Sequence, residues 1–493
     1  MNFKYKSLLL VAVSGSMLLG SCKKGFLDIN DNPNSPTDVN ITPELIFTQA
    51  QTAVAARAAS RNFNFITNWL GYTGASGSYA IDGTETTYNV DQTFGEGIWA
   101  NNYNTLFDLY QVRTKAIAKG DTVLAGASMI LSAKLWQDLV DVFGNIPYKQ
   151  AFQGSTNPRP SYDNGQAVYN DLLLMLDTAK MYMNTTAKST FATIDATYSG
   201  NQDNWIRFAN TMKLRLLIHQ TPKVITSEPT AELAKIMDGG TTLNIIRTSA
   251  QTASVQPGYK DEVSKQQPFY ANYGWTPAAA SANEITRVNQ YLLDQLGNNA
   301  DPRISRLSTS NTNGVVYGLS QGNPTSNTAA RLGIGLVQQG VTATARQWVM
   351  TNIESLFLEA EAGARGWNTG TSAQTSYTNA VNASFSFLGA GSAASYLANS
   401  TMAQWPATQA DQIRIIAYQK WVALTELDPM EVWTDFRRLP AYLPNGYLSV
   451  NPSANAQGIP NRLLYPQSEF TANSENALAQ GVNNPYQKIF WQP

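Results

Sequence analysis

The chain has 493 residues, of which only 14% are charged, and its formal net charge is −1. Such sparse charge argues against a nucleic-acid partner, because phosphate binding requires concentrated Lys and Arg. One histidine and one cysteine exclude multi-histidine zinc sites and most nucleophilic chemistry. Neutral polar side chains and an aromatic content of 11% suit a neutral polar ligand.

The first residues predict an exported lipoprotein. A basic start and an apolar run occupy residues 1–19, and the run ends in LGSC, residues 19–22. The run is shorter than the roughly 20 apolar residues that a membrane-spanning helix needs. Its end resembles a bacterial lipobox, whose cysteine is acylated after cleavage. The alternative is an ordinary signal peptide, but Cys22 is the only cysteine and has no disulfide partner in the chain. We therefore expect residues 1–21 to be a lipoprotein signal peptide and Cys22 to carry lipid.

The next segment predicts a tether and then a single domain. Residues 22–40 are rich in Asn, Asp and Pro and lack apolar periodicity, as in a tether. The domain, residues 41–493, should open with a helix over 43–59, because Pro43 suits a first helical position. Residues 71–97 have no helical period and predict a long loop, of the kind that is often functional.

Helical periodicity dominates the rest of the domain. Pro429 should kink or restart the helix that contains it, and the tail from Leu439 reads as coil. His219 has apolar neighbours at helical spacing and predicts a buried, structural histidine. Paired antiparallel helices favour a helical-repeat architecture. The expected helices are at about 98–119, 123–143, 163–183, 203–220, 349–366, 372–388 and 410–435, with shorter patches near 229–238 and 284–297.

Seven sequence blocks carry a family resemblance. They are FLDINDNPNSPT (26–37), DVFGNIPYKQAF (141–152), WIRFANTMKLRL (205–216), ESLFLEAEAGARGW (354–367), YQKWVAL (418–424), EVWTDFRRL (431–439) and IPNRLLYPQSE (459–469). In this order they resemble the SusD/RagB family of nutrient-binding outer-membrane lipoproteins, most closely its SusD-like 2 branch. The resemblance implies a mainly α fold, with tetratricopeptide-like helix pairs and irregular loop regions that form the ligand face.

The same resemblance implies a partner and a location. The partner is a SusC-type TonB-dependent outer-membrane transporter. We expect the protein to be lipid-anchored in the outer membrane and exposed at the cell surface. In the bacteria that carry this family, acidic residues after the lipidated cysteine often accompany export to the cell surface. Here Lys23 and Lys24 follow Cys22 directly, so the sequence does not decide which face of the outer membrane carries the protein.

Charged residues in the family blocks have two interpretations. A carboxylate pair could hydrolyse glycosides, but ion pairs at helix ends are the interpretation we adopt, and two arginines also complement a helix C-terminus. We therefore predict no catalytic residue. The residues concerned are Lys213, Arg215, Glu354, Glu359, Glu361, Glu431, Asp435, Arg437 and Arg438.

Two aromatic stretches, 69–99 and 266–277, have the chemistry of a sugar site. An aromatic ring offers an apolar face to a sugar, and planar amides and carboxylates bind its hydroxyl groups. Core packing is the alternative for each ring, and we expect at least one of Tyr270, Tyr273 and Trp275 to contact ligand. The candidates are Trp69, Tyr72, Tyr79, Asp82, Tyr88 and Trp99 in the first stretch, and Tyr270, Asn272, Tyr273 and Trp275 in the second.

These observations predict a non-catalytic lipoprotein that binds a nutrient, foremost an oligosaccharide, and delivers it to the transporter. The alternatives are an oligopeptide-binding lipoprotein of the same architecture and a helical-repeat interaction scaffold. No cofactor or metal ligand is predicted. Asn- and Asp-rich loops leave a structural calcium ion open, although no EF-hand pattern is present.

Overall fold

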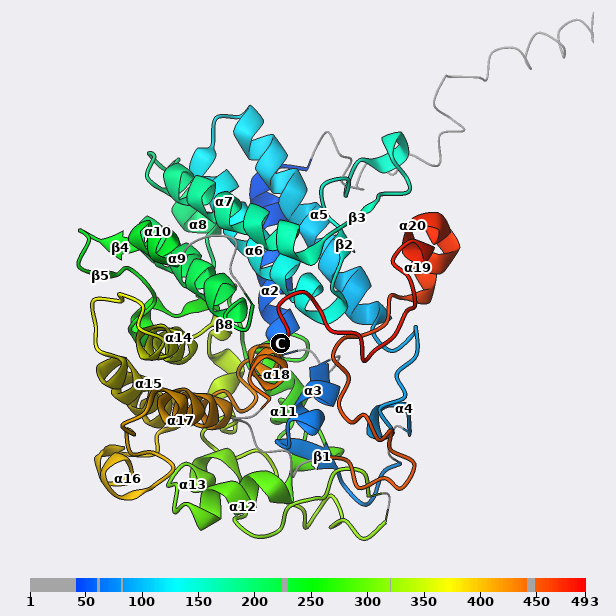
Figure 1. Ribbon diagram of the computed structural model, residues 1–493, viewed down its shortest axis with the longest axis vertical. Helices are drawn as coiled ribbons and strands as arrows, with labels where there is room; N and C mark the ends of the chain where they lie inside the picture. The colour runs from blue at the N-terminus through cyan, green and yellow to red at the C-terminus, as the bar shows by residue number, and fades with distance from the viewer. Residues whose placement is uncertain (1–40, 60–62, 81–82, 224–228, 320, 441–447) are drawn as a thin grey trace, which may run out of the picture. The chain divides into compact units, whose positions relative to one another are not determined.

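The computed structural model describes residues 41–493, apart from 60–62, 81–82, 224–228, 320 and 441–447 (Figure 1). The predicted signal peptide, Cys22 and the tether lie outside the described residues. Residues Pro43–Pro493 form one compact unit.

The first half of this unit is a layer of long helices packed in chain order (Figure 1). The helix α6 lies at its centre and is buried along almost its whole length. Asp121 caps its N-terminus by accepting from Leu124 N at 3.2 Å, and Gly144 ends it at φ 84°. The predicted helices are confirmed to within a few residues. Their bounds are α2 Pro43–Ala58, α5 Glu96–Ala118, α6 Thr122–Phe143, α7 Gly165–Met183 and α9 Gln202–His219.

Within the described residues, α6 is also the one helix long and apolar enough to pass a membrane-span test based on length and composition. Of its most apolar window, 94% is buried inside the protein. This burial accounts for the apolar sequence, as in the core helix of a globular domain.

A second helical group comes from the C-terminal half and packs against α9 (Figure 1). The segment predicted as one helix over 410–435 is two helices, because Pro429 occupies the first turn of the second. Asp428 caps that turn by accepting from Glu431 N at 3.1 Å. Pro429 therefore restarts the helix. The bounds are α14 Asn352–Ala364, α15 Ala373–Leu388, α17 Gln409–Ala423 and α18 Pro429–Arg438.

Strands are short and form four two-stranded antiparallel ladders in the described part of the chain. The ladder β1–β7 joins segments far apart in the sequence and pairs Thr73 with Val288 and Ala75 with Thr286. The expected helix over 284–297 was therefore wrong in its first half, because this part is a strand and Asn289 caps a helix that begins only at Gln290. The strands are β1 Thr73–Ala75, β2 Ile146–Pro147, β3 Tyr162–Asp163, β4 Met237–Asp238, β5 Thr242–Leu243, β6 Ala253–Val255, β7 Thr286–Val288 and β8 Gln347–Met350.

Short helices fill the connections. One of them, α4, lies in the stretch 71–97 predicted as a long loop, where β1 and the start of α5 at Glu96 are the other regular elements among the described residues. The bounds are α3 Asn64–Trp69, α4 Gly83–Thr86, α8 Phe191–Ile194, α10 Pro229–Ala234, α11 Pro268–Tyr273, α12 Gln290–Asn298, α13 Ile304–Leu307, α16 Ala394–Asn399, α19 Gln467–Ala472 and α20 Ser474–Leu478.

A buried ion network joins α9, α17 and α18. Glu431 forms an ion pair with Arg215, 2.7 Å from its Nε, lies 2.8 Å from His219 Nε2, and also pairs with Lys420. Arg438 pairs with Glu361 at 2.6 Å in the same core. The prediction of a buried His219 is confirmed. The charged residues do form ion pairs, but these join different helices and are not confined to helix ends.

Candidate functional site

A cleft of about 200 Å³ opens beside the β1–β7 ladder. We call it the ladder cleft. Glycine and alanine residues form part of its wall. Its described lining residues are Asn64, Asn68, Gly74, Ala75, Ala80, Glu85, Ile285, Thr286, Tyr317 and Gly318.

Two amide side chains of α3 face the cleft. Asn64 and Asn68 are four residues apart and therefore share one face of the helix. Asn68 Nδ2 donates to Glu85 Oε1 at 2.8 Å, and Asn68 Oδ1 accepts from Thr73 Oγ1 at 2.8 Å. Asn64 Oδ1 accepts from the Tyr273 hydroxyl. These bonds fix the orientation of both amides.

Glu85 and Tyr317 complete the polar wall. Glu85 belongs to α4 and is half-buried. The Tyr317 hydroxyl donates to the Glu85 backbone carbonyl at 3.1 Å, and Trp69 Nε1 donates to the same oxygen at 3.3 Å. The turn that carries Glu85 is thereby held against two aromatic residues, so the carboxylate is pre-positioned.

Two exposed side chains lie next to this wall. Ile285 is 46% exposed and lines the cleft, and Tyr79, beside the lining residue Ala80, is 36% exposed. The turn before Tyr79 is anchored, because Ser76 N donates to Ile285 O at 2.9 Å and Gly77 N donates to Pro324 O at 3.0 Å. The Tyr79 ring is thus displayed on a fixed backbone.

Trp275 lies in a turn, residues 275–281, that precedes β7. It forms a backbone bridge with Ser281, and the Arg331 guanidinium lies 5.1 Å from its ring centre. Arg331 is also 3.9 Å from Glu284, which accepts from Arg287 at 2.6 Å. Burial lowers the pKa of Arg287, and the Glu284 carboxylate opposes this effect.

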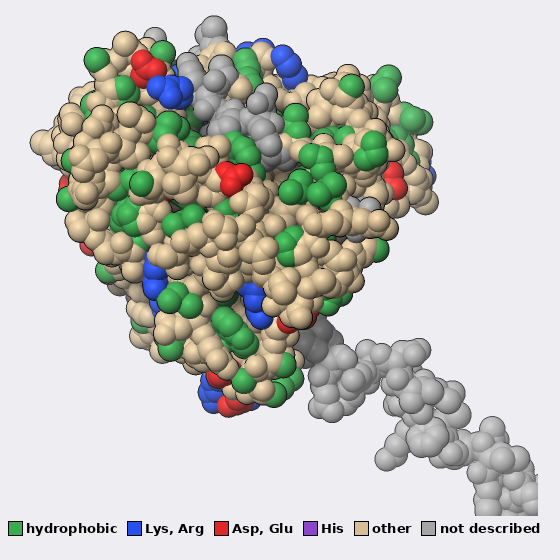
Figure 2. Space-filling view, turned by 90° about the horizontal axis from the view of Figure 1, so that it is seen from below, with side chains coloured by type: hydrophobic (Ala, Val, Ile, Leu, Met, Phe, Trp, Pro, Cys, Tyr) green, Lys and Arg blue, Asp and Glu red, His purple; other side chains and the backbone are tan. Residues whose placement is uncertain are grey.

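The face that contains β1 and α12 is poor in charge. These elements lie at the lower end of the view in Figure 1, and Figure 2 shows the unit from that side. Uncharged side chains and backbone cover most of this face, with scattered apolar groups and few Lys, Arg, Asp or Glu. Such a surface suits a neutral polar ligand.

Comparison with known proteins gives the family. A family model described as "Starch-binding associating with outer membrane" matches residues 33–466. The chain belongs to the SusD-like 2 family. This is a family of nutrient- and glycan-binding proteins associated with the outer membrane, and its members bind ligands and are not known as enzymes. No curated protein matches the chain.

Solved structures share the SusD-like fold. The chain is similar to a chitin-binding SusD homolog from Flavobacterium johnsoniae, with a TM-score of 0.73, 21% identity and coverage of 90% of this chain and 98% of that one. It is also similar to a SusD/RagB family protein from Bacteroides thetaiotaomicron, with a TM-score of 0.72, 18% identity and coverage of 92% and 99%. The predicted family and mainly α fold are confirmed.

Most of the rings predicted for the site lie in the core of this SusD-like structure. Trp69, Tyr72, Tyr88 and Trp99 are each at most 5% exposed. The Tyr72 hydroxyl donates to Trp421 O at 2.6 Å, and Tyr88 accepts from Ser449 N at 2.7 Å. These four rings present no face to a ligand here, because partners from the C-terminal half cover them.

In the second predicted stretch, two of the three predicted rings are also buried. Tyr270 and Tyr273 are buried, and the Tyr270 hydroxyl accepts from Gly340 N at 2.7 Å. Asn272 donates to Ala59 O at 2.7 Å and so connects α11 to the end of α2. Trp275 is half-buried. Asp82 lies outside the described residues.

Tyr79 and Trp275, one from each predicted stretch, thus belong to segments that bond to residues 281–288: Ser76 N donates to Ile285 O, and Trp275 forms a bridge with Ser281. Sequence reasoning missed Asn64, Asn68, Glu85 and Tyr317. The spacing of the two asparagines in NFITN, polar residues four apart among apolar ones, was the one signal that could have found them.

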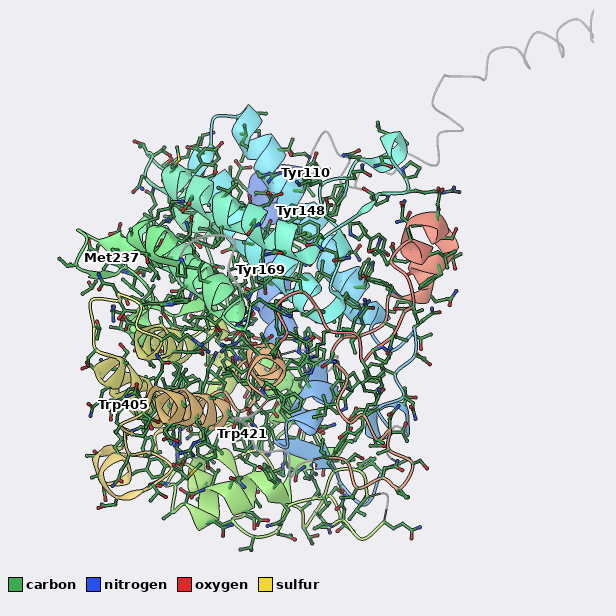
Figure 3. The ribbon with its side chains drawn as sticks, viewed as in Figure 1. Tyr110, Tyr148, Tyr169, Met237, Trp405 and Trp421 are labelled. Atoms are coloured by element: carbon green, nitrogen blue, oxygen red, sulfur yellow. The ribbon has the colours of Figure 1, made fainter. Side chains whose placement is uncertain are left out.

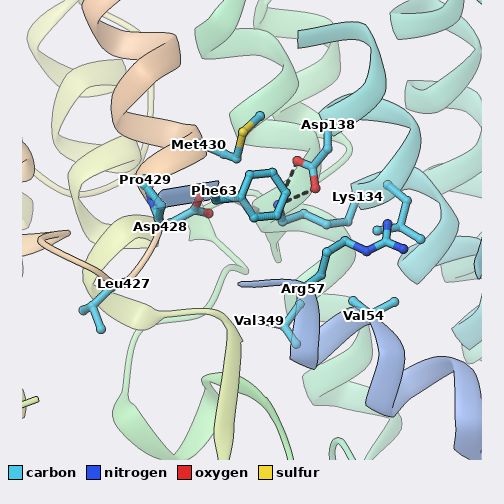
Figure 4. A pocket seen from close by; sticks show the side chains of 11 residues that line it. Val54, Arg57, Phe63, Lys134, Asp138, Val349, Leu427, Asp428, Pro429 and Met430 are labelled. Carbon is cyan, nitrogen blue, oxygen red and sulfur yellow. Dashed lines mark hydrogen bonds and ion pairs between the residues drawn. The ribbon is translucent and has the colours of Figure 1, made fainter. Parts of the chain in front are cut away.

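Another cavity, of about 30 Å³, lies between α2, α6 and the start of α18 (Figure 4). Lys134 donates to Asp138 at 2.9 Å beside it, and Arg57 Nη1 is buried there without a hydrogen-bond partner in the described part of the chain. This volume accommodates about one water molecule. It is too small for a sugar.

No group of three or more His, Cys, Asp or Glu side chains suited to a metal ion occurs among the described residues.

Proposed function

We propose that this SusD-like protein binds a neutral oligosaccharide in the ladder cleft and delivers it to a SusC-type TonB-dependent transporter. One observation carries the proposal: the cleft combines fixed side-chain amides and a single carboxylate with an exposed aromatic ring beside it. Sugar hydroxyl groups both donate and accept hydrogen bonds, and amides match both roles. The rings of Tyr79 and Trp275 would receive the apolar faces of sugar units that extend beyond the cleft.

The charge of the cleft supports a neutral ligand. Among the described lining residues Glu85 is the only charged one. An anionic ligand would be repelled by this carboxylate, and no Lys or Arg among those residues would offset the repulsion. Glycoside hydrolysis normally requires two carboxyl groups, so the described cleft supports capture of the sugar without cleavage.

Lipidation of Cys22 would keep the cleft near the transporter. The predicted tether of residues 22–40 would hold the domain at the membrane surface, and tethering raises the effective concentration of a bound ligand at the transporter entrance. We place the protein in the outer membrane, exposed at the cell surface.

Binding measurements on the mature chain, residues 22–493 with Cys22→Ser, test the ligand class. Chito-oligosaccharides are the first probes, because a protein of the same fold is described as chitin-binding. Starch, xylan and mannan oligosaccharides and a peptide library complete the panel. Saturable glycan binding without product release is the expected result, whereas binding of peptides alone would favour the oligopeptide alternative.

Variants then locate the site. Tyr79→Ala should weaken glycan binding by about 5- to 30-fold, the equivalent of about 1 to 2 kcal/mol for one stacked ring. Phe387→Ala is the matched control, since Phe387 lies on α15 and is 40% exposed, close to the 36% of Tyr79. Equal effects of both substitutions would place the ligand elsewhere. Purification of the native protein from outer membranes should recover the transporter, and its absence would contradict the delivery step.

A further inference from the structure

A second recess, of about 200 Å³, lies on the layer formed by α5, α6 and α7. Figure 3 labels two of its tyrosines, Tyr110 and Tyr148, close to one another in that layer. We call it the aromatic recess. Its lining residues are Leu106, Tyr110, Arg113, Ser132, Trp136, Tyr148, Lys149, Ala151, Phe152 and Met175.

Aromatic rings form most of its wall. The Phe152 ring centre is 5.6 Å from that of Tyr110 and 5.8 Å from that of Trp136. Trp136 and Tyr148 meet edge to face at 5.0 Å. Ring faces at such angles provide apolar surface for the C–H groups of a flat or chair-shaped ring.

Two donors of the recess, the Arg113 guanidinium and the Tyr148 hydroxyl, have no protein acceptor among the described residues, whereas the Ser132 hydroxyl donates to Ser128 O at 2.8 Å. Within the described residues the Arg113 guanidinium makes no hydrogen bond or ion pair, and it lies 5.7 Å from the Tyr110 ring centre. The Tyr148 hydroxyl likewise has no hydrogen-bond partner among those residues. Lys149 adds a second cation, which is 3.3 Å from Asp171 and remains 60% exposed. Asp163 is a second carboxylate beside the loop of Tyr148 and Lys149, so Asp171 and Asp163 face the two cations, and Arg113 is the cation that no carboxylate pairs with in the described part of the chain.

The loop that carries half of these groups is fixed before any ligand arrives. Asp163 Oδ2 accepts from the backbone N–H of Tyr148 at 3.1 Å and of Lys149 at 2.8 Å. Phe152 has a φ of 67°, a left-handed conformation that is uncommon for residues other than glycine. Strained residues of this kind persist where the surrounding structure holds them, and they are concentrated at binding sites.

These features select the ligand. An apolar side chain would leave the Tyr148 hydroxyl and the Arg113 guanidinium desolvated without acceptors, which is costly. A neutral sugar would stack on the rings but leave the Arg113 guanidinium without an anionic partner. We infer that the aromatic recess binds one acidic sugar unit, with the carboxylate at Arg113 and the sugar ring on Tyr110, Trp136 and Phe152. This inference does not rest on the function proposed for the ladder cleft.

Calorimetry on the mature chain tests the inference. The probes are di- and trigalacturonate, their methyl esters, which keep the ring and lose the charge, inorganic sulfate, and an acidic peptide. The variants are Arg113→Gln and Lys149→Gln, and Lys119→Gln serves as the control because Lys119 is exposed at the end of α5 and does not line the recess.

The expected result is saturable binding of the acid and at least tenfold weaker binding of the ester. Arg113→Gln should reduce the affinity for the acid by tenfold or more, and Lys119→Gln should leave it unchanged. Tyr79→Ala should also leave it unchanged, which separates this site from the ladder cleft. Equal binding of acid and ester, binding of the peptide in preference to the sugar, or an affinity unaffected by Arg113→Gln would overturn the inference. Unchanged unfolding curves of the variants establish that their folds are intact.

Discussion

Replacing Glu426 by glutamine should stabilise the protein at neutral pH. Glu426 follows α17, is only 4% exposed, and its Oε1 has no hydrogen-bond partner within the described residues. Burial raises the pKa of this carboxyl to about 8, and a hydrogen bond with Thr67 opposes the rise only in part. Thr67 belongs to α3, so the buried carboxyl lies behind the helix that presents Asn64 and Asn68 to the ladder cleft.

The size of the effect follows from proton uptake. The pKa of Glu426 in the folded protein is above its ordinary value of 4.5. Below pH 4.5 the carboxyl is protonated in both the folded and the unfolded chain and costs no stability. As the pH rises toward 8, the unfolded chain loses this proton first, and the free energy of unfolding falls. At pH 7.5, the protonation cost amounts to about 4 kcal/mol, at about 1.4 kcal/mol for each pH unit above the ordinary pKa. A buried glutamine amide recovers only part of this, so we expect Glu426→Gln to gain about 2 to 3 kcal/mol at pH 7.5 and almost nothing at pH 4.

Urea unfolding followed by tryptophan fluorescence at both pH values measures the gain. Glu431→Gln is the matched control, five residues further along the chain. Burial alone would raise the pKa of Glu431, but Arg215, Lys420 and His219 together hold it well below its ordinary value. Glu431→Gln should therefore cost about 3 to 5 kcal/mol, because it leaves buried cations unpaired. A Glu426→Gln protein no more stable than the wild type at pH 7.5 would refute the reasoning.

Three further predictions concern the anchor, the ladder cleft and the ion network. Cys22→Ser should abolish incorporation of labelled palmitate and move the protein into the aqueous phase of a detergent partition; continued labelling would contradict lipidation at this residue. Gly318→Ala should lower stability by about 1 to 3 kcal/mol, since Gly318 has a φ of 92° and a Cβ would meet Ser449 Oγ at 2.3 Å; thermal unfolding should show this, and an unchanged midpoint would count against the cleft geometry. Burial alone would lower the pKa of His219, but Glu431 and Asp141 raise it, so its stabilising charge is fully present below pH 6.5 and is lost as the pH rises through the raised pKa. The free energy of unfolding of His219→Gln should therefore fall less than that of the wild type between pH 6 and pH 9, and identical slopes would contradict the assignment.

Local sequence signals predicted the long helices well. A helix such as α6 carries its own start and end, because Asp121 caps the first turn and Gly144 supplies the left-handed residue after the last. Pro429 likewise marked a boundary through its missing N–H. Four of the family blocks lie mainly in α9, α14, α17 and α18, where they supply the buried ion pairs of the core.

Local sequence signals did not predict which distant segments pair with one another. Residues 286–288 are a strand because 73–75 lie beside them, more than two hundred positions earlier in the chain. Only this pairing creates the ladder cleft. The positions of Asn64 and Glu85 at one wall follow from it, and no spacing in the sequence indicates that they meet.

The sequence by itself determined the long helices and the chemistry of the candidate binding residues: amides, aromatic rings and few charges. The tertiary structure decided which of those residues face solvent. Trp69 and Tyr79 belong to the same aromatic stretch, yet Trp69 packs against Trp433 of α18 whereas Tyr79 lies on an exposed turn. A ring is equally suited to core packing and to sugar stacking, and which of the two it does depends on whether a distant part of the chain covers its face.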